Sequence, residues 1–509
     1  MSRYKRYFRN ELHLSVTSGR LFAALILLGL MLFGLGQTRV ALAASFTVNT
    51  TADTVDANPG NGVCADGGGN CSLRAAVMET NALAGADTIT LPAGTYILSL
   101  AGSDDTANAG DLDITGDLII NGAGAASTIV DGNNIDRVFH LLSGVTVTIN
   151  DSKITGGLSG GNPGGGIYNA ATLTVNNSVI TNNSTISFQS GGGIANEFGT
   201  LTVNDSTISN NSSDNIGGGI YNDSGMATIN NSAIINNISN SGNGGGGLYN
   251  SNSATMAVNN VTVSGNSAQN VGGGIFNSGP LTLKNSTVVS NTSDSDNDGA
   301  GDGGGILRNA GTVTIQNTII ANNKKGPSTP DDCSASADLS LSFSLLETIT
   351  NCTFTDGGNN ITAADPLLNT LADNGGNTQT HALQATSPAI DAGDDTTCLS
   401  TDQIGTSRPQ GNGCDMGAFE LIPTPAPGGV DTNLQLWLKA NAGVTTSGNS
   451  VTNWSDQSGI GNNVSQGTGA SQPTLQTNAI NGNPALLLDG NDQYLRQVDE
   501  KTEPRSKID

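Results

Sequence analysis

The residues best suited to hold an ion form one short acidic stretch. The nine residues 294–302 read DSDNDGAGD, with carboxylates at the first, third, fifth and ninth positions and glycine at the sixth. An EF-hand-type loop presents its first oxygen ligands to Ca²⁺ in this order. The twelfth position is Gly305 instead of the usual glutamate, and no helix is predicted on either side. Two interpretations remain open, a solvated acidic loop and a Ca²⁺ site formed by Asp294, Asp296, Asp298 and Asp302.

Ring side chains at a repeated position suggest a second chemistry, the stacking of sugars. Three glycines, an aliphatic residue, a variable residue and an asparagine recur from residues 164, 191, 217, 245, 272 and 303. The variable position holds Tyr168, Ala195, Tyr221, Tyr249, Phe276 and Leu307. We expect this position to face outward, so that Tyr168, Tyr221, Tyr249 and Phe276 are candidates for stacking on a glycan. The alternative is that the rings pack on one another between neighbouring repeats.

Catalytic chemistry is weakly supported. Asp151 and Asp205 would lie two repeats apart, about 10 Å on the interstrand spacing, which is at the edge of the range for a glycosidase pair. Both stand where other repeats carry asparagine. Beyond the signal region only His140 and His381 remain, so a zinc site or a histidine-based triad is hard to build. No catalytic residue is assigned, and no metal site other than the acidic stretch.

A repeat of about 27 residues organises the middle of the chain. A second motif follows most glycine motifs, for example LTVNNSVITNN from residue 173 and LTVNDSTISNN from residue 201. Each repeat offers two or three short strands of alternating apolar and polar residues, separated by Gly, Asn and Ser turns. No helix-period segment lies between the strands. The sequence therefore predicts an all-β solenoid, a parallel β-helix.

Stacked repeats would place equivalent residues in columns at the interstrand spacing. The aliphatic position predicts a buried column of Ile167, Ile194, Ile220, Leu248, Ile275 and Ile306. The asparagine position predicts an amide ladder of Asn169, Asn196, Asn222, Asn250, Asn277 and Asn309. A second ladder is predicted along Asp151, Asn177, Asp205, Asn231, Asn260, Asn285 and Asn317.

Charge and glycine pattern exclude two classes of ligand. The 509-residue chain has a formal net charge of −24 and no basic face, which excludes a nucleic-acid partner held by phosphate contacts. The glycine runs recur six times and lack the GK[ST] ending and the strand-then-helix context of a phosphate-binding loop. A nucleotide held by such a loop is therefore excluded as well.

The N-terminus and the cysteines indicate export. Residues 1–43 are typical of a long secretory signal peptide, since basic residues precede the apolar run 21–35 and Ala-Leu-Ala at 41–43 suits cleavage. A membrane anchor is the alternative, although this run is slightly short for a span. The six cysteines form three sequence-local pairs, which predicts disulfides in an exported chain. The pairs are Cys64 with Cys71, Cys333 with Cys352, and Cys398 with Cys414.

Two flanking stretches resemble known families. FTVNTTADTVDANPGNGVCADGGGNCSLRAAVMETNA (46–82) resembles the N-terminal CSLREA domain of bacterial exported β-helix proteins. DPLLNTLADNGGNTQTHALQATSPAIDAG and RPQGNGCDMGAFE, within 365–420, resemble the choice-of-anchor Q region that closes such helices. The resemblance implies a right-handed parallel β-helix of the pectin-lyase-like kind. It implies an N-terminal cap over 44–86, coils over 87–360 and a closing region over 361–421.

The predicted cap contains one short helix within CSLRAAVMETNAL (71–83), for which Ser72 is a plausible N-cap. The family name implies glutamate where this chain has Ala75. The reciprocal half of the capping box is therefore missing, which weakens the helix start by about 0.5–1 kcal/mol.

The C-terminal part is predicted to be a separate piece. A proline-rich linker over 422–432 leads to residues 433–509. There NLQLWLKANAGV and NWSDQSGIGNNVSQ resemble the first half of a laminin-G or concanavalin-like lectin domain. The segment is shorter than a complete jelly roll, so we expect a truncated, poorly ordered β-sandwich fragment.

Together these features predict a secreted or cell-surface β-helix that acts as a structural or adhesive stalk. The expected partner is a polysaccharide or cell-surface glycan, the one cofactor suggested is Ca²⁺, and no membrane span remains once the signal peptide is removed. The alternative is a polysaccharide lyase or glycoside hydrolase acting on an acidic polysaccharide in the groove of the helix. Fold alone does not imply catalysis, and the sequence indicates no oligomeric state.

Overall fold

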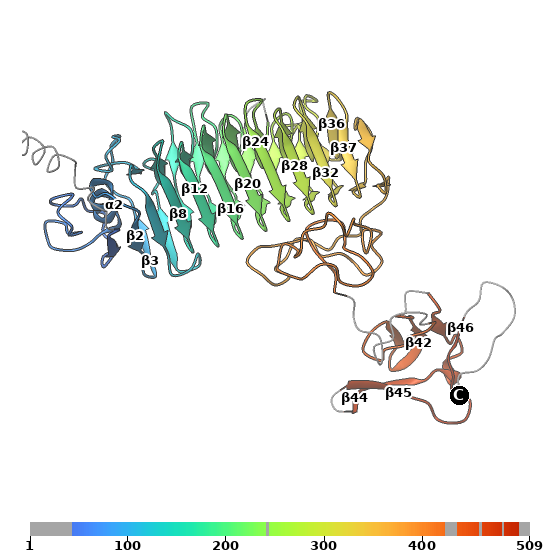
Figure 1. The fold of residues 1–509 in the computed structure, drawn as a ribbon. Helices are drawn as coiled ribbons and strands as arrows, with labels where there is room; N and C mark the ends of the chain where they lie inside the picture. Colours follow the sequence, from blue (N-terminus) through green and yellow to red (C-terminus); the bar gives the residue numbers. More distant parts are fainter. Residues whose placement is uncertain (1–42, 241–243, 423–434, 458–460, 481–482, 498–509) are drawn as a thin grey trace, which may run out of the picture.

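The computed structural model describes residues 43–240, 244–422, 435–457, 461–480 and 483–497. Within them, strands β1 to β40 wind into one β-helix whose strands pair in parallel, except that β35 is antiparallel to β34. Helix α2 (Leu73–Ala82) lies at its N-terminal end (Figure 1). The all-β solenoid predicted from the repeats is thereby confirmed. Apart from Ala43, the predicted signal peptide lies outside the described residues, as does nearly all of the predicted linker.

Four sheets, here named A to D, run along the β-helix, and a complete coil visits them in the order C, A, B, D. Sheet A contains β1 (Ser45–Thr47), β2 (Asp87–Thr90), β5 (Leu118–Asn121), β8 (Thr146–Asn150), β12 (Thr172–Asn176), β16 (Thr200–Asn204), β20 (Met226–Asn230), β24 (Thr255–Asn259), β28 (Leu281–Lys284), β32 (Val313–Gln316), β37 (Leu339–Ser342) and β39 (Phe354–Asp356). Sheet B contains β3 (Gly94–Ile97), β6 (Thr128–Asp131), β9 (Lys153–Thr155), β13 (Val179–Thr181), β17 (Thr207–Ser209), β21 (Ala233–Ile235), β25 (Thr262–Ser264), β29 (Thr287–Val289), β33 (Ile319–Ala321), β38 (Leu345–Leu346) and β40 (Ile361–Thr362).

The other two sheets are made of shorter strands. Sheet C contains β4 (Leu112–Ile114), β7 (Phe139–Leu141), β11 (Ile167–Asn169), β15 (Ile194–Glu197), β19 (Ile220–Asp223), β23 (Leu248–Asn250), β27 (Ile275–Asn277), β31 (Ile306–Arg308) and β36 (Cys333–Ala335). Sheet D contains β10 (Leu158–Ser159), β14 (Ser184–Thr185), β18 (Ser212–Ser213), β22 (Ile238–Ser239), β26 (Ser267–Ala268), β30 (Thr292–Ser293), β34 (Lys324–Lys325) and β35 (Thr329–Pro330).

Neighbouring coils pair in register because the alternation of apolar and polar residues is the same in each. In the β12–β16 pair, Leu173 lies opposite Leu201 and Val175 opposite Val203. These four side chains are fully buried, while Thr174 between them is half-buried on the outside. A shift by one residue would turn the whole apolar set outward, so the pattern specifies the register.

The columns predicted from the glycine motif are confirmed with one exception. The six aliphatic side chains pair in register and are fully buried. From Asn169 to Asn250, each side-chain Nδ2 donates to Oδ1 of the asparagine in the following coil, at 2.6–2.9 Å, and the ladder ends at Asn277. The prediction that Asn309 continues this ladder is wrong. Arg308 lies opposite Asn277 because the last motif has one additional residue before its asparagine.

The second predicted ladder forms one rung, in which Asn260 Nδ2 donates to Asn231 Oδ1 at 3.1 Å, and the continuous ladder is displaced by one residue. Asp151, Asn177 and their equivalents occupy the turn from sheet A to sheet B with φ of 47° to 53°, a left-handed conformation that Asn and Asp tolerate. The continuous ladder is formed one position earlier, by Asn121, Asn150, Asn176, Asn204, Asn230 and Asn259. A third, unpredicted ladder of buried side chains joins Asn183, Asn211, Asn237, Asn266, Asn291 and Asn323, and ends on Asp332.

Helix α2 covers the N-terminal end of the coils. Its residues Leu73 and Val77 belong to the same buried core as Ile89 of the first coil. The predicted N-cap is confirmed, since the Ala75 N–H donates to Ser72 Oγ at 3.0 Å.

Residues 361–421, here called the docked segment, begin with β40, the last strand of sheet B, and then run along the side of the coils (Figure 1). The physical reason is that sheet B carries outward apolar residues, Val289 and Ile319, which need a cover. Leu383 and Met416 of the docked segment form a second core with them. At the C-terminal end of the coils, residues 347–353 connect β38 to β39, and the Cys333–Cys352 disulfide ties them to β36.

The three predicted disulfides are present, Cys64–Cys71, Cys333–Cys352 and Cys398–Cys414. Among the described residues, no helix has both the length and the apolar character needed to cross a bilayer.

The C-terminal residues form an antiparallel sheet with its own small core. The sheet contains β41 (Val444–Ser447), β42 (Ser450–Trp454), β43 (Val464–Ser465), β44 (Thr474–Ile480), β45 (Asn483–Leu487) and β46 (Arg496–Gln497). Val451 and Val464 are fully buried beneath it, with Leu495 packed against them.

Candidate functional site

The outward face of sheet C carries one continuous column of side chains, here called the ring column. Strand pairing places them in the order Asp113, His140, Tyr168, Ala195, Tyr221, Tyr249, Phe276 and Leu307. The column exists because this position alternates with the buried aliphatic and asparagine positions in each short strand.

The rings of the column pack against one another and expose little of their surface to solvent. Tyr249 and Phe276 are stacked with parallel planes and centroids 4.7 Å apart, and Tyr221 meets Tyr249 at 5.6 Å. Phe276 is only 8% exposed, and Tyr168, Tyr221 and Tyr249 are half-buried. The four side chains lie on the outward face, as expected, but Phe276 is buried there and the tyrosines are only partly exposed to solvent. Their arrangement fits the alternative, packing between neighbouring coils.

An Asp–His pair stands at the N-terminal end of the ring column. Nδ1 of His140 lies 2.7 Å from Oδ1 of the fully buried Asp113, so the ring can donate Nδ1–H to this carboxylate. The other Asp113 oxygen accepts the Ala107 N–H at 2.9 Å. Asp105, Asp113 and His140 each offer one ligand atom, all within 4.8 Å of one another, a nitrogen and oxygen set that suits a divalent transition metal.

A buried ion pair adjoins this pair. Arg137 Nε lies 2.6 Å from Asp111 Oδ2. Burial raises the pKa of Asp111 to about 6, with Arg137 opposing the shift and the carboxylates of Asp113 and Asp136 adding to it. The Arg137 guanidinium also lies 5.6 Å from the centroid of the Tyr168 ring.

The tyrosine hydroxyls of the column are paired with carboxylates. Tyr168 donates to Glu197 Oε2 at 3.1 Å. Burial raises the pKa of Tyr168 to about 12, and the charge of Glu197 adds to the shift. Burial likewise raises the pKa of Tyr221, helped by Asp223. Both phenols therefore stay protonated near neutral pH and act as hydrogen-bond donors, not as bases.

The cluster around His140 can hold and orient a base, since a carboxylate fixes the tautomer of the imidazole. It is not predictable from the glycine motif, because the coil that carries β7 lacks the three glycines. The signal that would have found it is the alternation in Phe139-His140-Leu141, which matches Ile167-Tyr168-Asn169 in the following coil.

The acidic stretch is only partly assembled as predicted. Asp294, Asp296 and Asp298 each offer a carboxylate oxygen within 4.8 Å of the others. Asp294 is buried, and the Gly299 N–H donates to its Oδ1 at 3.2 Å. Asp302 instead forms an ion pair with Lys325 at 3.2 Å. The Ca²⁺ site stays a prediction, with three grouped carboxylates in place of four.

Asp151 and Asp205 were considered above as a possible pair of glycosidase carboxylates. Both occupy left-handed turn positions, with φ of 53° and 49°. Asn177 stands between them in the same column. Their residue type is explained by turn geometry, because Asp and Asn are the non-glycine residues that adopt this conformation most readily.

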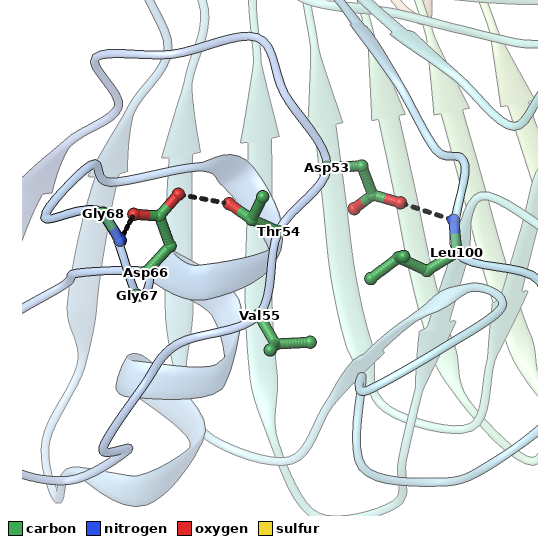
Figure 2. Close-up of a pocket in the computed structure, with 7 residues that line it drawn as sticks. All are labelled: Asp53, Thr54, Val55, Asp66, Gly67, Gly68 and Leu100. Atoms are coloured by element: carbon green, nitrogen blue, oxygen red, sulfur yellow. Dashed lines mark hydrogen bonds between the residues drawn. The ribbon is translucent and has the colours of Figure 1, made fainter.

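A pocket of about 410 Å³ lies in the N-terminal cap, and Figure 2 shows its lining. Its two carboxylates already have donors. Asp53 pairs with the buried Arg74 and accepts the Leu100 N–H, and Asp66 accepts the Gly68 N–H and the Thr54 hydroxyl. Hydrogen bonds from backbone N–H groups lower the pKa of Asp66. This pocket is explained by the folding of the cap.

No protein-family model matches the chain, and no curated protein matches it, so the three family resemblances stay predictions. Among solved structures, the chain is similar to the pectate lyase Pel9A, known from a crystal structure, with a TM-score of 0.37 and 14% sequence identity. The match covers 75% of this chain and 98% of that chain. The β-helix described here rests on its own strand pairing, and no activity is carried over from this likeness.

Proposed function

We propose that the protein is an exported, rigid β-helix stalk that binds a polysaccharide or a cell-surface glycan without turning it over. The observation that supports a rigid stalk is that the same side-chain contacts join each coil to the next. Three asparagine ladders and the ring column run parallel to the axis, so that a displacement of one coil would break contacts in several columns at once. The three disulfides support a location outside the cell.

Retention on insoluble polysaccharides and on cell-wall fragments tests this proposal with the full chain. We expect the protein to be retained while the supernatant gains neither reducing ends nor unsaturated products. Failure to bind any of these polymers contradicts the stalk proposal, and so does release of either kind of product.

A second candidate function, a polysaccharide lyase or hydrolase, is supported by the Asp113–His140 pair beside Arg137. A lyase needs a base to take the proton next to a uronate carboxylate and a cation to hold that carboxylate. His140 and Arg137 are of the right types, although Arg137 already pairs with Asp111. This candidate predicts unsaturated products from polygalacturonate or alginate that disappear in His140→Ala. Tyr249→Phe, from the same column, is the matched control and keeps any such activity.

A further inference from the structure

Two phenylalanines on either side of strand β15 are the most exposed large apolar side chains of the described chain. Phe188, in the loop that leads from β14 to β15, is 79% exposed, and Phe198, directly after β15, is 74% exposed. Between them, Ala195 of β15 is fully buried, and it is the one position among the five central members of the ring column that lacks a ring.

Both phenylalanines sit on strained backbone. Phe188 has φ of 62° and Phe198 has φ of 61°, a left-handed conformation that bulky residues rarely adopt. The following coil holds each backbone in place. Asp214 Oδ2 accepts the Phe188 N–H at 2.8 Å, and the Asp223 carbonyl accepts the Phe198 N–H at 2.9 Å. A backbone strained in this way, holding an apolar ring in water, points to a binding role.

The fold itself does not require a ring at either position. In the following coil the turn equivalent to Phe198 is Ser224, which adopts the same conformation with φ of 55°. The segment between β14 and Gly191 is two residues longer than its counterpart between β18 and Gly217. Phe188 belongs to this longer loop, so neither ring is a product of the repeat.

The surroundings of the two rings select an uncharged ligand. No Lys, Arg or His occurs between Lys153 and Lys284, a stretch that contains all the central coils. Glu197, Asp214 and Asp223 lie next to the two phenylalanines in sequence or through hydrogen bonds. A uronate chain would meet these carboxylates, while Arg137, which lies over the Tyr168 ring of the preceding coil, is buried and paired with Asp111. The hydroxyl groups of a neutral sugar, in contrast, can donate hydrogen bonds to the carboxylates.

We infer that Phe188 and Phe198 are the carbohydrate-stacking residues of this protein and that they bind a neutral glycan that crosses strand β15. Their exposed ring faces can stack on sugars, which the mutually packed rings of the ring column cannot do to the same extent. The inference deepens the proposed stalk and rests on it.

Binding of cellohexaose and chitohexaose to the full chain tests the inference, with hexagalacturonate as the acidic comparison. We expect a neutral hexasaccharide to bind and each of Phe188→Gly and Phe198→Gly to weaken it roughly tenfold. Glycine is unstrained at these φ values, so the melting temperature should stay the same or rise. Phe198→Trp keeps a ring and should keep binding, and Met226→Ala, a 59% exposed apolar residue, is the matched control.

Results that differ from these expectations contradict either the assignment of the two rings, the ligand class or the proposed function. Unchanged affinity in the double glycine variant overturns the assignment of the two rings and leaves the glycan-binding stalk standing. A fall of several degrees in melting temperature shows that the rings are structural and overturns the assignment as well. Stronger binding of hexagalacturonate than of the neutral sugars overturns the ligand class. No binding of any polymer overturns both the inference and the proposed function.

Discussion

In the coils of the β-helix each polar contact is repeated by the next coil, whereas in the docked segment each contact occurs once. Asn196, Asn222 and Asn250 make the same amide bond three times in succession. The docked segment is held by unrelated bonds, such as Thr262 to Gln403 at 2.6 Å and Ser264 to His381 at 2.9 Å.

The difference shows how the two regions divide the work of stability. A repeated contact is specified by a sequence period and joins neighbours about 27 residues apart. A single contact such as Asn260 to Thr401 joins residues 141 apart and depends on the folded shape of both partners. We therefore expect substitutions in the coils to disturb stability most, and those in the docked segment to act locally.

The largest effect should come from interrupting the buried ladder with Asn222→Ala. Asn222 is fully buried, accepts from Asn196 and donates to Asn250 and to the Thr255 carbonyl. Removing the amide takes away these three hydrogen bonds, at about 1 kcal/mol each, so we expect a loss of about 3 kcal/mol in the free energy of unfolding in urea. Asn230→Ala, in the half-buried outer ladder, is the matched control and should lose clearly less. Equal losses would show that burial does not decide the strength of these ladders.

The second largest effect should be that of pH on the stability of the docked segment. Burial raises the pKa of Asp415 to about 7, far above its ordinary value of 3.8. The folded chain then keeps this proton to higher pH than the unfolded chain, so the contribution of Asp415 to stability is complete below about pH 4 and is lost as pH rises toward 7. Hydrogen exchange of residues 361–421, expressed as protection relative to the intrinsic exchange rate at each pH, should show less protection at pH 8 than at pH 5. Asp415→Asn should flatten this dependence, and an unchanged slope would assign it to another group.

A smaller effect is expected where the docked segment contacts the coils. Asn317 accepts the Asp394 N–H at 2.8 Å and sits at φ of 50°. Asn317→Gly keeps the turn and removes the contact, so we expect about 1–2 kcal/mol less stability and faster proteolysis within 361–421. Asp205→Gly, at the equivalent turn, should change stability by less than about 0.5 kcal/mol. Proteolysis that is no faster in Asn317→Gly than in Asp205→Gly would mean that this contact does not hold the segment.

The smallest effect concerns the acidic stretch 294–302. It belongs neither to the repeated contacts of the coils nor to the docked segment. If Asp294, Asp296 and Asp298 bind Ca²⁺, then Ca²⁺ at ten times its Kd adds about 1.4 kcal/mol of stability, seen as a rise in melting temperature. Asp298→Asn should abolish the rise, and Asp302→Asn should keep it because Asp302 pairs with Lys325. A rise that persists in Asp298→Asn would place the ion elsewhere.

The repeats made much of the coil structure predictable. Alternation in segments such as LTVNN identified strands, faces and register, and the buried asparagine ladder followed from its spacing. The failures are equally local in origin. One additional residue placed Arg308 opposite Asn277, and the turn after sheet A required a left-handed residue where a ladder was predicted.

The candidate site was less predictable, because it depends on which ring faces are free. The motif drew attention to Tyr249 and Phe276, yet these rings stack on each other and leave little surface for a ligand. Phe188 and Phe198 lie outside the motif, and only their exposure and backbone conformation distinguish them.

By itself the sequence determined the architecture of the coils, because a strand repeat brings identical residues together at a fixed spacing whatever the rest of the chain does. Only the tertiary structure decided the place of the docked segment, the pairing of Asp113 with His140 and the exposure of the two phenylalanines. Each of these depends on contacts between residues that no period relates, and such contacts exist only once the chain has folded.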